Sequence, residues 1–135
     1  MWDHRKTFVH VTMQMADAHA KGTDTSCIAF GHDNRHMATR GGDDTLKLWD
    51  IRAFKKPVHV AQNLFSRFEM TDCCFSPDDR MVVTATSMEK GETAGKLVFF
   101  ERDTFNKVIE LEVGNSHVIR TLWHPRLNQV SFIFK

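Results

Sequence analysis

Hydrophobic and polar positions alternate in short runs along most of the chain, and the pattern is clearest over residues 24–52. Three apolar runs lie in this stretch, separated by polar turns of a few residues: 26–30, 36–39 and 46–49. This spacing is typical of antiparallel strands joined in a meander. A fourth strand is predicted at residues 57–61, where Pro57 suits the edge of a sheet because it has no N–H to donate. The stretch therefore predicts one four-stranded antiparallel sheet, which needs neighbours to bury its faces.

The same pattern continues after this sheet. Strands of a second sheet are predicted at four further runs: residues 70–75, 81–85, 96–100 and 106–112. Residues 116–123 and 129–134 are predicted to begin a third sheet, and residues 7–15 alternate as an outer strand does. The loop over residues 86–95 is longer than a hairpin turn requires, so we expect either a tolerated surface insertion or a contact with a partner. The chain is thus predicted to be all-β.

Aromatic markers recur at a nearly constant interval. Two Trp-Asp pairs, Trp2-Asp3 and Trp49-Asp50, lie 47 positions apart, and Phe99 follows Trp49 by 50 positions. A second set of markers keeps steps of 45 and 48 positions: Phe30, Phe75 and Trp123. Two independent sets with nearly the same period indicate a structural repeat of roughly 45 residues.

Composition and charge exclude several classes of protein. The chain has 135 residues, enough for one ordinary domain, and its 41% apolar and 26% charged residues are typical of a globular protein. A formal net charge of +1 disfavours a general polyanion binder. No run approaches the roughly 18 apolar residues of a membrane span, and no signal-peptide pattern begins the sequence. Three cysteines, two of them adjacent, suit a reducing compartment, so a cytosolic or nuclear location is expected.

Catalytic and metal sites are not predicted. Asp43-Asp44 and Asp78-Asp79 could be read as carboxylate pairs, but both pairs lie in predicted turns, where Asp side chains bind backbone amides. The eight histidines and three cysteines show neither CxxC nor HExxH spacing, and adjacent cysteines on a strand point to opposite faces. We therefore expect no enzymatic activity, no catalytic residues, no cofactor and no metal site.

The repeat length and the Trp-Asp and Phe-Ser-Pro markers resemble those of WD40 repeats, in which each repeat forms one four-stranded blade of a β-propeller. The resemblance implies a buried hydrogen-bonded relay in the first complete blade, whose matching residues here are His19, Thr39, Asp43 and Trp49. In the second blade Phe99 would replace the Trp and the loop lacks a matching Asp. That blade is therefore expected to be held by apolar packing alone.

Longer stretches resemble a narrower group, the gastrulation-defective type of WD-repeat protein. The runs that carry this resemblance are TDTSCIAF, RGGDDTLKLWDIR, MTDCCFSPDD and KLVFFER followed by LWHP. Because a propeller has four to eight blades, the chain is expected to be an incomplete propeller of about two full blades with parts of two others. The expected divisions are the end of a preceding blade at 1–15, blades at 16–61 and 62–112, and a truncated blade from 116 to 135.

A further motif suggests a partner. Many WD-repeat substrate receptors of cullin-4 ubiquitin ligases carry WDxR, whose Arg docks on the damaged-DNA-binding adaptor of the ligase. The matching residues here are Trp49, Asp50 and Arg52. The resemblance thus implies a non-enzymatic, nuclear interaction scaffold of such a ligase, linked to chromatin ubiquitination and DNA repair, which binds proteins rather than membranes.

Two other interpretations stay open. The chain could belong to an RNA-processing or other nucleic-acid-associated scaffold that uses the loops at residues 54–56 and 65–68, although its near-zero net charge makes direct nucleic-acid binding a poor fit. It could also lack any specific function of its own, because it would be too incomplete to present the surface of its parent protein.

Overall fold

The computed structural model describes residues 1, 5 and 11–135, and every element in that part of the chain except one short turn of 3₁₀ helix is a β-strand. The elements are β1 (Thr25–Phe30), β2 (His36–Gly41), β3 (Leu46–Asp50), the 3₁₀ turn η1 (Ile51–Ala53), β4 (His59–Ala61), β5 (Cys73–Phe75), β6 (Met81–Thr86), β7 (Lys96–Glu101), β8 (Lys107–Glu112), β9 (Val118–Trp123) and β10 (Val130–Phe134). No helix among the described residues is long and apolar enough to cross a membrane.

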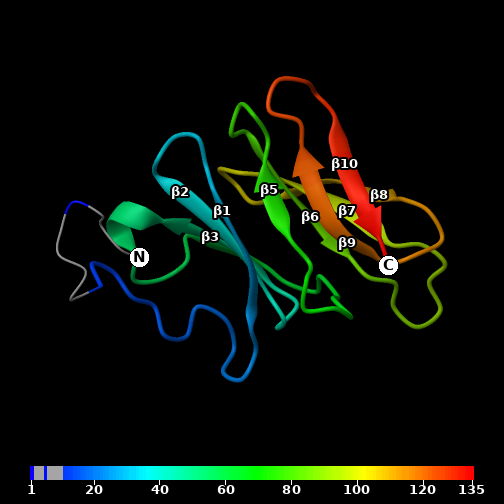
Figure 1. Cartoon of the computed structure of the whole chain (residues 1–135), viewed down its shortest axis with the longest axis horizontal. Coiled ribbons are helices and arrows are strands. Elements are labelled where there is room, and N and C mark those ends of the chain that lie inside the picture. Colours follow the sequence, from blue (N-terminus) through cyan, green and yellow to red (C-terminus); the bar gives the residue numbers. More distant parts are fainter. Residues whose placement is uncertain (2–4, 6–10) are drawn as a thin grey trace.

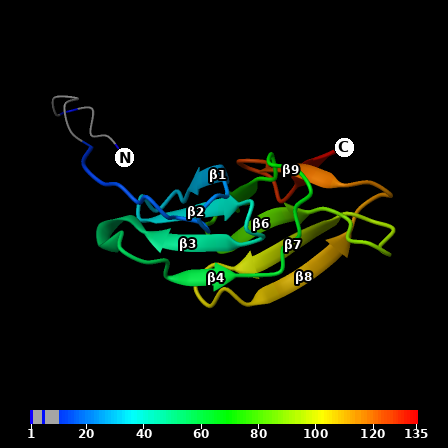
Figure 2. The ribbon, with the colours of Figure 1, turned by 90° about the horizontal axis from the view of Figure 1, so that it is seen from below.

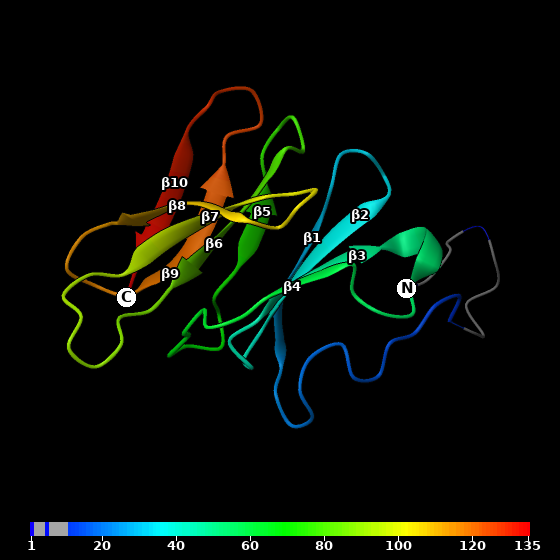
Figure 3. The same cartoon turned by 180° about the vertical axis from the view of Figure 1, so that it is seen from behind.

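The strands form three antiparallel sheets (Figure 1). The first sheet has the order β1-β2-β3-β4, the second β5-β6-β7-β8, and the third contains β9 and β10. Figure 3 shows the three sheets fanning out side by side without closing into a ring. The prediction of all-β, four-stranded antiparallel blades in an incomplete propeller is therefore confirmed.

The sheets stack strand on strand. The inner strands β1, β5 and β9 contact one another in series, whereas β4 and β8 lie at the same outer side of their sheets (Figure 2). The main apolar core lies between the first and second sheets and is built from side chains of both sheets and of two connections: Ala38, Leu46, Leu48, Leu64, Cys73, Phe75, Val82, Val98, Phe100 and Phe105. A smaller cluster lies between the second and third sheets: Val83, Ala85, Leu97, Phe99 and Val118.

Because successive strands are antiparallel, the connections gather at two rims. One rim, which we name the WDIR rim after the sequence of residues 49–52, carries the turns at residues 31–35, 51–58, 76–80, 102–106 and 124–129. The opposite rim carries those at 42–45, 62–72, 87–95 and 113–117. Several turns need a left-handed residue, and Asn34, Asp44 and Asp79 supply it with φ of 55°, 58° and 57°. Asn and Asp tolerate this conformation better than other residues with a Cβ, so the polar turn sequences are matched to the turns they form.

Two predicted strands differ from the structure. Trp2-Asp3 and the first part of the strand predicted at residues 7–15 lie outside the described residues, and residues 11–15 form no strand, so that prediction was wrong there. The strand predicted at residues 70–75 is shortened to β5. Hydrogen bonds of the Thr71 hydroxyl with the Phe68 carbonyl and with Ser66 Oγ hold the preceding segment in a turn instead.

The register of the second sheet also corrects the proposed repeat. In the first sheet Met37 pairs with both Phe30 and Trp49. In the second sheet the equivalent residue, Val82, pairs with Phe75 and Phe100. Phe100 and not Phe99 therefore occupies the position of Trp49, and Phe99 faces the third sheet instead.

Candidate interaction surface

The four side chains expected to form a relay are hydrogen-bonded in series across the first sheet. His19 Nδ1 lies 2.8 Å from Asp43 Oδ1, and His19 Nε2 lies 2.9 Å from Thr39 Oγ1. Trp49 Nε1 donates to the same Thr39 oxygen at 2.9 Å. Since an ionised Asp can only accept, Nδ1 of His19 carries the proton and Nε2 accepts from the Thr39 hydroxyl. The relay thus satisfies polar groups that are almost entirely buried, His19 being 5% and Trp49 2% exposed.

The charge states of the relay follow from its burial. Burial lowers the pKa of His19 in spite of its hydrogen bond to Asp43. Burial alone would raise the pKa of Asp43, but hydrogen bonds from Thr45, Ala20 and His19 hold it well below its usual range. A neutral imidazole therefore faces an ionised carboxylate, and the relay serves to fix structure.

The relay attaches the segment before β1 to the sheet. His19 comes from this segment, Thr39 from β2, Asp43 from the β2–β3 turn and Trp49 from β3. Gly41 makes room for the imidazole, because a Cβ at this position would lie 2.1 Å from His19 Nδ1. Sequence reasoning missed Gly41, and the glycine pair that ends β2 was the available signal.

The WDxR residues have three different environments. Trp49 is buried in the relay and packs on Phe54 with ring centroids 5.2 Å apart. Asp50 accepts from Arg35 Nε and Nη2 at 3.0 and 2.8 Å, and its other oxygen caps η1 by accepting from the Arg52 backbone N–H at 2.9 Å. Arg52 itself is exposed at the WDIR rim. Of the three motif residues, only Arg52 presents a largely accessible side chain to a partner.

The surroundings of Arg52 are basic. Lys55 and Lys56 are exposed on the same connection, and Arg35 of the neighbouring β1–β2 turn binds Asp50 at the end of β3. Arg102, which follows β7 of the second sheet, corresponds to Ile51 of the first. The Ile51 backbone N–H binds the Arg35 carbonyl, just as the Arg102 backbone N–H binds the Arg80 carbonyl. Arg102 pairs with Asp33 at 3.1 Å and so does not repeat the Arg52 environment.

Other predicted candidates are accounted for by structural contacts. Asp79 accepts from the backbone N–H groups of His32 and Asp33, at 3.0 and 2.7 Å, and so joins the second sheet to the first. Asp44 accepts from the Ser66 N–H at 2.8 Å. Among the described residues, no three His, Cys, Asp or Glu side chains gather in a way that could hold a metal ion.

The two loops considered for nucleic-acid binding do not share a surface. Residues 54–56 lie at the WDIR rim, whereas residues 65–68 lie at the opposite rim, where the Ser87 N–H binds the Phe65 carbonyl. Phe54 is also partly buried against Trp49. One strand of nucleic acid would have to bridge both ends of the first sheet to touch both loops.

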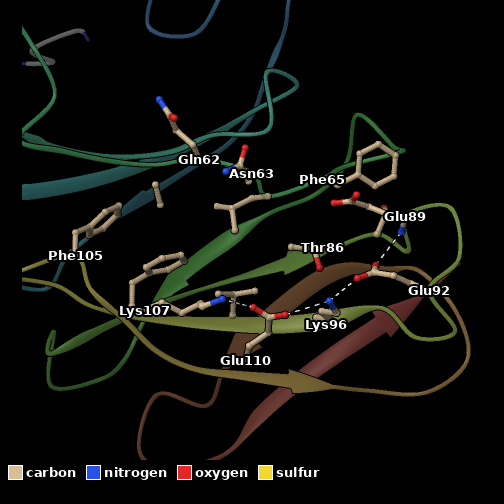
Figure 4. A pocket seen from close by; sticks show the side chains of 15 residues that line it. Gln62, Asn63, Phe65, Thr86, Glu89, Glu92, Lys96, Phe105, Lys107 and Glu110 are labelled. Carbon is tan, nitrogen blue, oxygen red and sulfur yellow. Dashed lines mark hydrogen bonds and ion pairs between the residues drawn. The ribbon is translucent and has the colours of Figure 1, made fainter.

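A groove of about 340 Å³ opens between β4 and the β7–β8 pair toward the opposite rim (Figure 4). A chain of ion pairs crosses its floor: Lys96 contacts Glu92 at 2.5 Å and Glu110 at 3.1 Å, and Lys107 contacts Glu110 at 2.6 Å. Glu92 belongs to the 86–95 loop, so this loop is tied to the second sheet by the ion pair with Lys96. Both lysines that line the groove are thus paired with glutamates that line it.

Comparison with known proteins finds similarity to WD-repeat proteins. The family described as "WD domain, G-beta repeat" matches residues 11–50. The chain is 53% identical over 130 residues to WD repeat-containing protein 70 of Xenopus tropicalis, covering 96% of this chain and 21% of that protein. The chain is 55% identical to WD repeat-containing protein 70 of Bos taurus, and the match covers 96% of this chain and 20% of that protein. It is 49% identical over 129 residues to the Gastrulation defective protein 1 homolog of Drosophila melanogaster, and this match covers 96% of this chain and 20% of that protein.

The predicted resemblance to WD40 repeats and to the gastrulation-defective type is therefore confirmed. The chain spans about a fifth of the length of the curated relatives it matches.

Proposed function

We propose that this chain, with its WD40-repeat sequence folded into four-stranded blades, serves as part of a non-enzymatic protein-interaction scaffold. WD-repeat sequence supports this class of function. The described side chains support it too, because the carboxylates once considered as catalytic pairs bind backbone amides of turns and neighbouring segments. An interaction scaffold needs a rigid frame with exposed side chains at its rims, and this chain has both.

We propose further that the scaffold is a substrate receptor of a cullin-4 ubiquitin ligase and that Arg52 docks on the damaged-DNA-binding adaptor. The observation that carries this proposal is the exposed guanidinium of Arg52 beside a fixed Asp50. No hydrogen bond or ion pair occupies the Arg52 side chain among the described residues. A guanidinium can bind a carboxylate through two parallel N–H groups, a geometry that Lys does not reproduce.

A nuclear location and a role in chromatin ubiquitination and DNA repair follow as parts of the same proposal. They depend on adaptor binding, and each would fail with it. The alternative of a nucleic-acid-associated scaffold receives less support, because the two candidate loops lie at opposite rims.

Adaptor binding is tested by pull-down of the purified adaptor with the chain. We expect Arg52→Ala to reduce the captured adaptor at least about tenfold, the usual scale for a buried Arg contact at an interface. Arg52→Lys should fall well below the unaltered chain. Lys55→Ala is the matched control, because Lys55 is exposed on the same connection, and it should retain capture.

Two results would contradict the ligase proposal. One is full adaptor capture by the Arg52→Ala variant, and the other is equal losses for Arg52→Ala and Lys55→Ala, which would indicate nonspecific attraction by a basic loop. The general role as an interaction scaffold would survive either result.

A further inference from the structure

Two cysteines meet where the first and second sheets pack on each other. Cys27 lies on β1 and Cys73 on β5, the inner strands of neighbouring sheets. Cys27 Sγ donates to the Cys73 backbone carbonyl at 3.5 Å. Cys73 belongs to the apolar cluster between the sheets, and Cys27 packs against that same cluster. Their side chains therefore face each other across one interface, and both are free thiols.

The two thiols differ in accessibility and in proton affinity. Cys27 is partly exposed, whereas Cys73 is only 4% exposed. A hydrogen bond with the Cys73 side chain lowers the pKa of Cys27 to about 7, although burial opposes the change. The same hydrogen bond, together with burial, raises the pKa of Cys73. Cys27 is thus the more accessible and the more acidic of the two thiols, and it supplies the attacking thiolate when it loses its proton.

We propose that Cys27 and Cys73 form a redox-active dithiol, which a small disulfide such as oxidised glutathione converts into a disulfide between the first and second sheets. In a reducing compartment such a bond would form transiently, as disulfides that sense oxidation do. It would link inner strands 46 residues apart in sequence, and so restrain the movement of one sheet against the other.

The reaction takes two exchange steps. The Cys27 thiolate attacks one sulfur of oxidised glutathione, the bond between the two glutathione sulfurs breaks, and one glutathione leaves as a thiolate that takes up a proton. Cys73 then loses its proton and attacks Cys27 Sγ, which releases the second glutathione as its thiol. One glutathione disulfide is reduced to two thiols for each protein disulfide formed.

Cys74 provides an internal control. It follows Cys73 in β5 but faces the third sheet, where its sulfur lies 3.9 Å from Thr121 Oγ1. Burial raises the pKa of the Cys74 thiol. Because side chains of adjacent strand residues point to opposite faces, Cys74 cannot replace Cys73 opposite Cys27.

The proposal is tested by incubating the chain with oxidised glutathione and counting free thiols by alkylation and mass spectrometry. We expect the three free thiols to fall to one, with peptide mapping that joins Cys27 to Cys73 and full reversal by dithiothreitol. Cys74→Ser should still form this link. Cys73→Ser should instead stop after the first step and retain one glutathione on Cys27. Thermal unfolding of the oxidised chain should shift to higher temperature.

Several outcomes would overturn the proposal. They are three persisting thiols, a link between Cys73 and Cys74, a link between two chains, or glutathione held by Cys74 in the Cys73→Ser variant. Cys27→Ala should prevent the protein disulfide. Because Cys27 is only partly buried, this variant is expected to fold, and circular dichroism checks that it does.

Discussion

The first and second sheets have the same four-strand topology but are stabilised by different chemistry. In the first sheet, the β3 residue paired with Met37 is Trp49, whose indole N–H ends a buried relay. In the second, the equivalent residue is Phe100, which stacks on Phe105 with ring centroids 5.3 Å apart and has no polar group to satisfy. One fold thus accepts either a bonded indole or a purely apolar ring at the same position.

The first sheet also buries a charge. Arg40 is completely buried, and burial lowers its pKa. Its guanidinium donates to the backbone carbonyls of Gly41 and Thr45, each at 3.1 Å, and to that of Leu64. These bonds tie β2 to its turn and to the connection after β4. Buried polar groups specify one arrangement because each needs its own partner, whereas apolar rings tolerate more than one packing.

Phe100→Ala tests the apolar side of this comparison and should have the largest effect. Phe100 is 5% exposed and lies in the core between the sheets, so its loss should destabilise the chain by about 3–5 kcal/mol. Urea unfolding of the purified chain measures the change. Val108→Ala in β8, where Val108 is 58% exposed, is the control and should change stability by less than about 0.5 kcal/mol. Equal effects would show that the core does not stabilise the second sheet as proposed.

Thr39→Val tests the polar side. The substitution keeps the shape of the buried side chain but leaves His19 Nε2 and the Trp49 N–H without their partner. Each stranded group costs at least about 1 kcal/mol, so we expect a loss of at least about 2 kcal/mol in urea unfolding.

The matched variant in the second sheet is Thr84→Val. The Thr84 hydroxyl makes one bond, to the Asp72 carbonyl at 2.7 Å, and its loss should cost about 1 kcal/mol. Losses of the same size at both positions would mean that the relay adds nothing beyond a single hydrogen bond.

The fold could be predicted from the sequence because strand spacing, turn residues and repeated markers all agree. The one-residue error in the second sheet shows the limit of such reasoning. Phe99 and Phe100 are adjacent aromatic residues, and only the pairing of Phe100 with Val82 decides which of them faces the first sheet. Sequence spacing cannot resolve this, since a single extra residue in the preceding loop exchanges the two faces of a strand.

The site residues could be predicted in part. His19, Thr39, Asp43 and Trp49 were placed by family resemblance, and the structure brings their side chains together. Arg35, which binds Asp50, was missed, although the predicted meander places the β1–β2 turn beside the end of the third strand. The meeting of Cys27 with Cys73 could not be predicted, since it depends on how two separate sheets pack.

The pH dependence of stability sharpens the comparison further and should be the smallest effect. The pKa of His19 in the folded chain lies below its ordinary value of 6.5. Above pH 6.5 the imidazole is neutral in both states, and its contribution to stability is fully present. As the pH falls below 6.5, the unfolded chain binds a proton that the folded chain resists, so the free energy of unfolding decreases until the pH passes the folded pKa. Asp43 loses its contribution only at lower pH, below its ordinary value of 3.8.

We would follow urea unfolding of the chain and of its His19→Gln variant between pH 8 and pH 5. Comparing the two isolates the contribution of His19, because the other seven of the eight histidines are the same in both. We expect the unaltered chain to lose stability more steeply with acid than the variant does. The strands of the second sheet contain no histidine, and the variant changes only His19, so the difference between the two slopes reports on the first sheet. Parallel slopes would mean that His19 takes up its proton equally well in both states, as a charged partner of Asp43, and that the relay is an ion pair in mild acid.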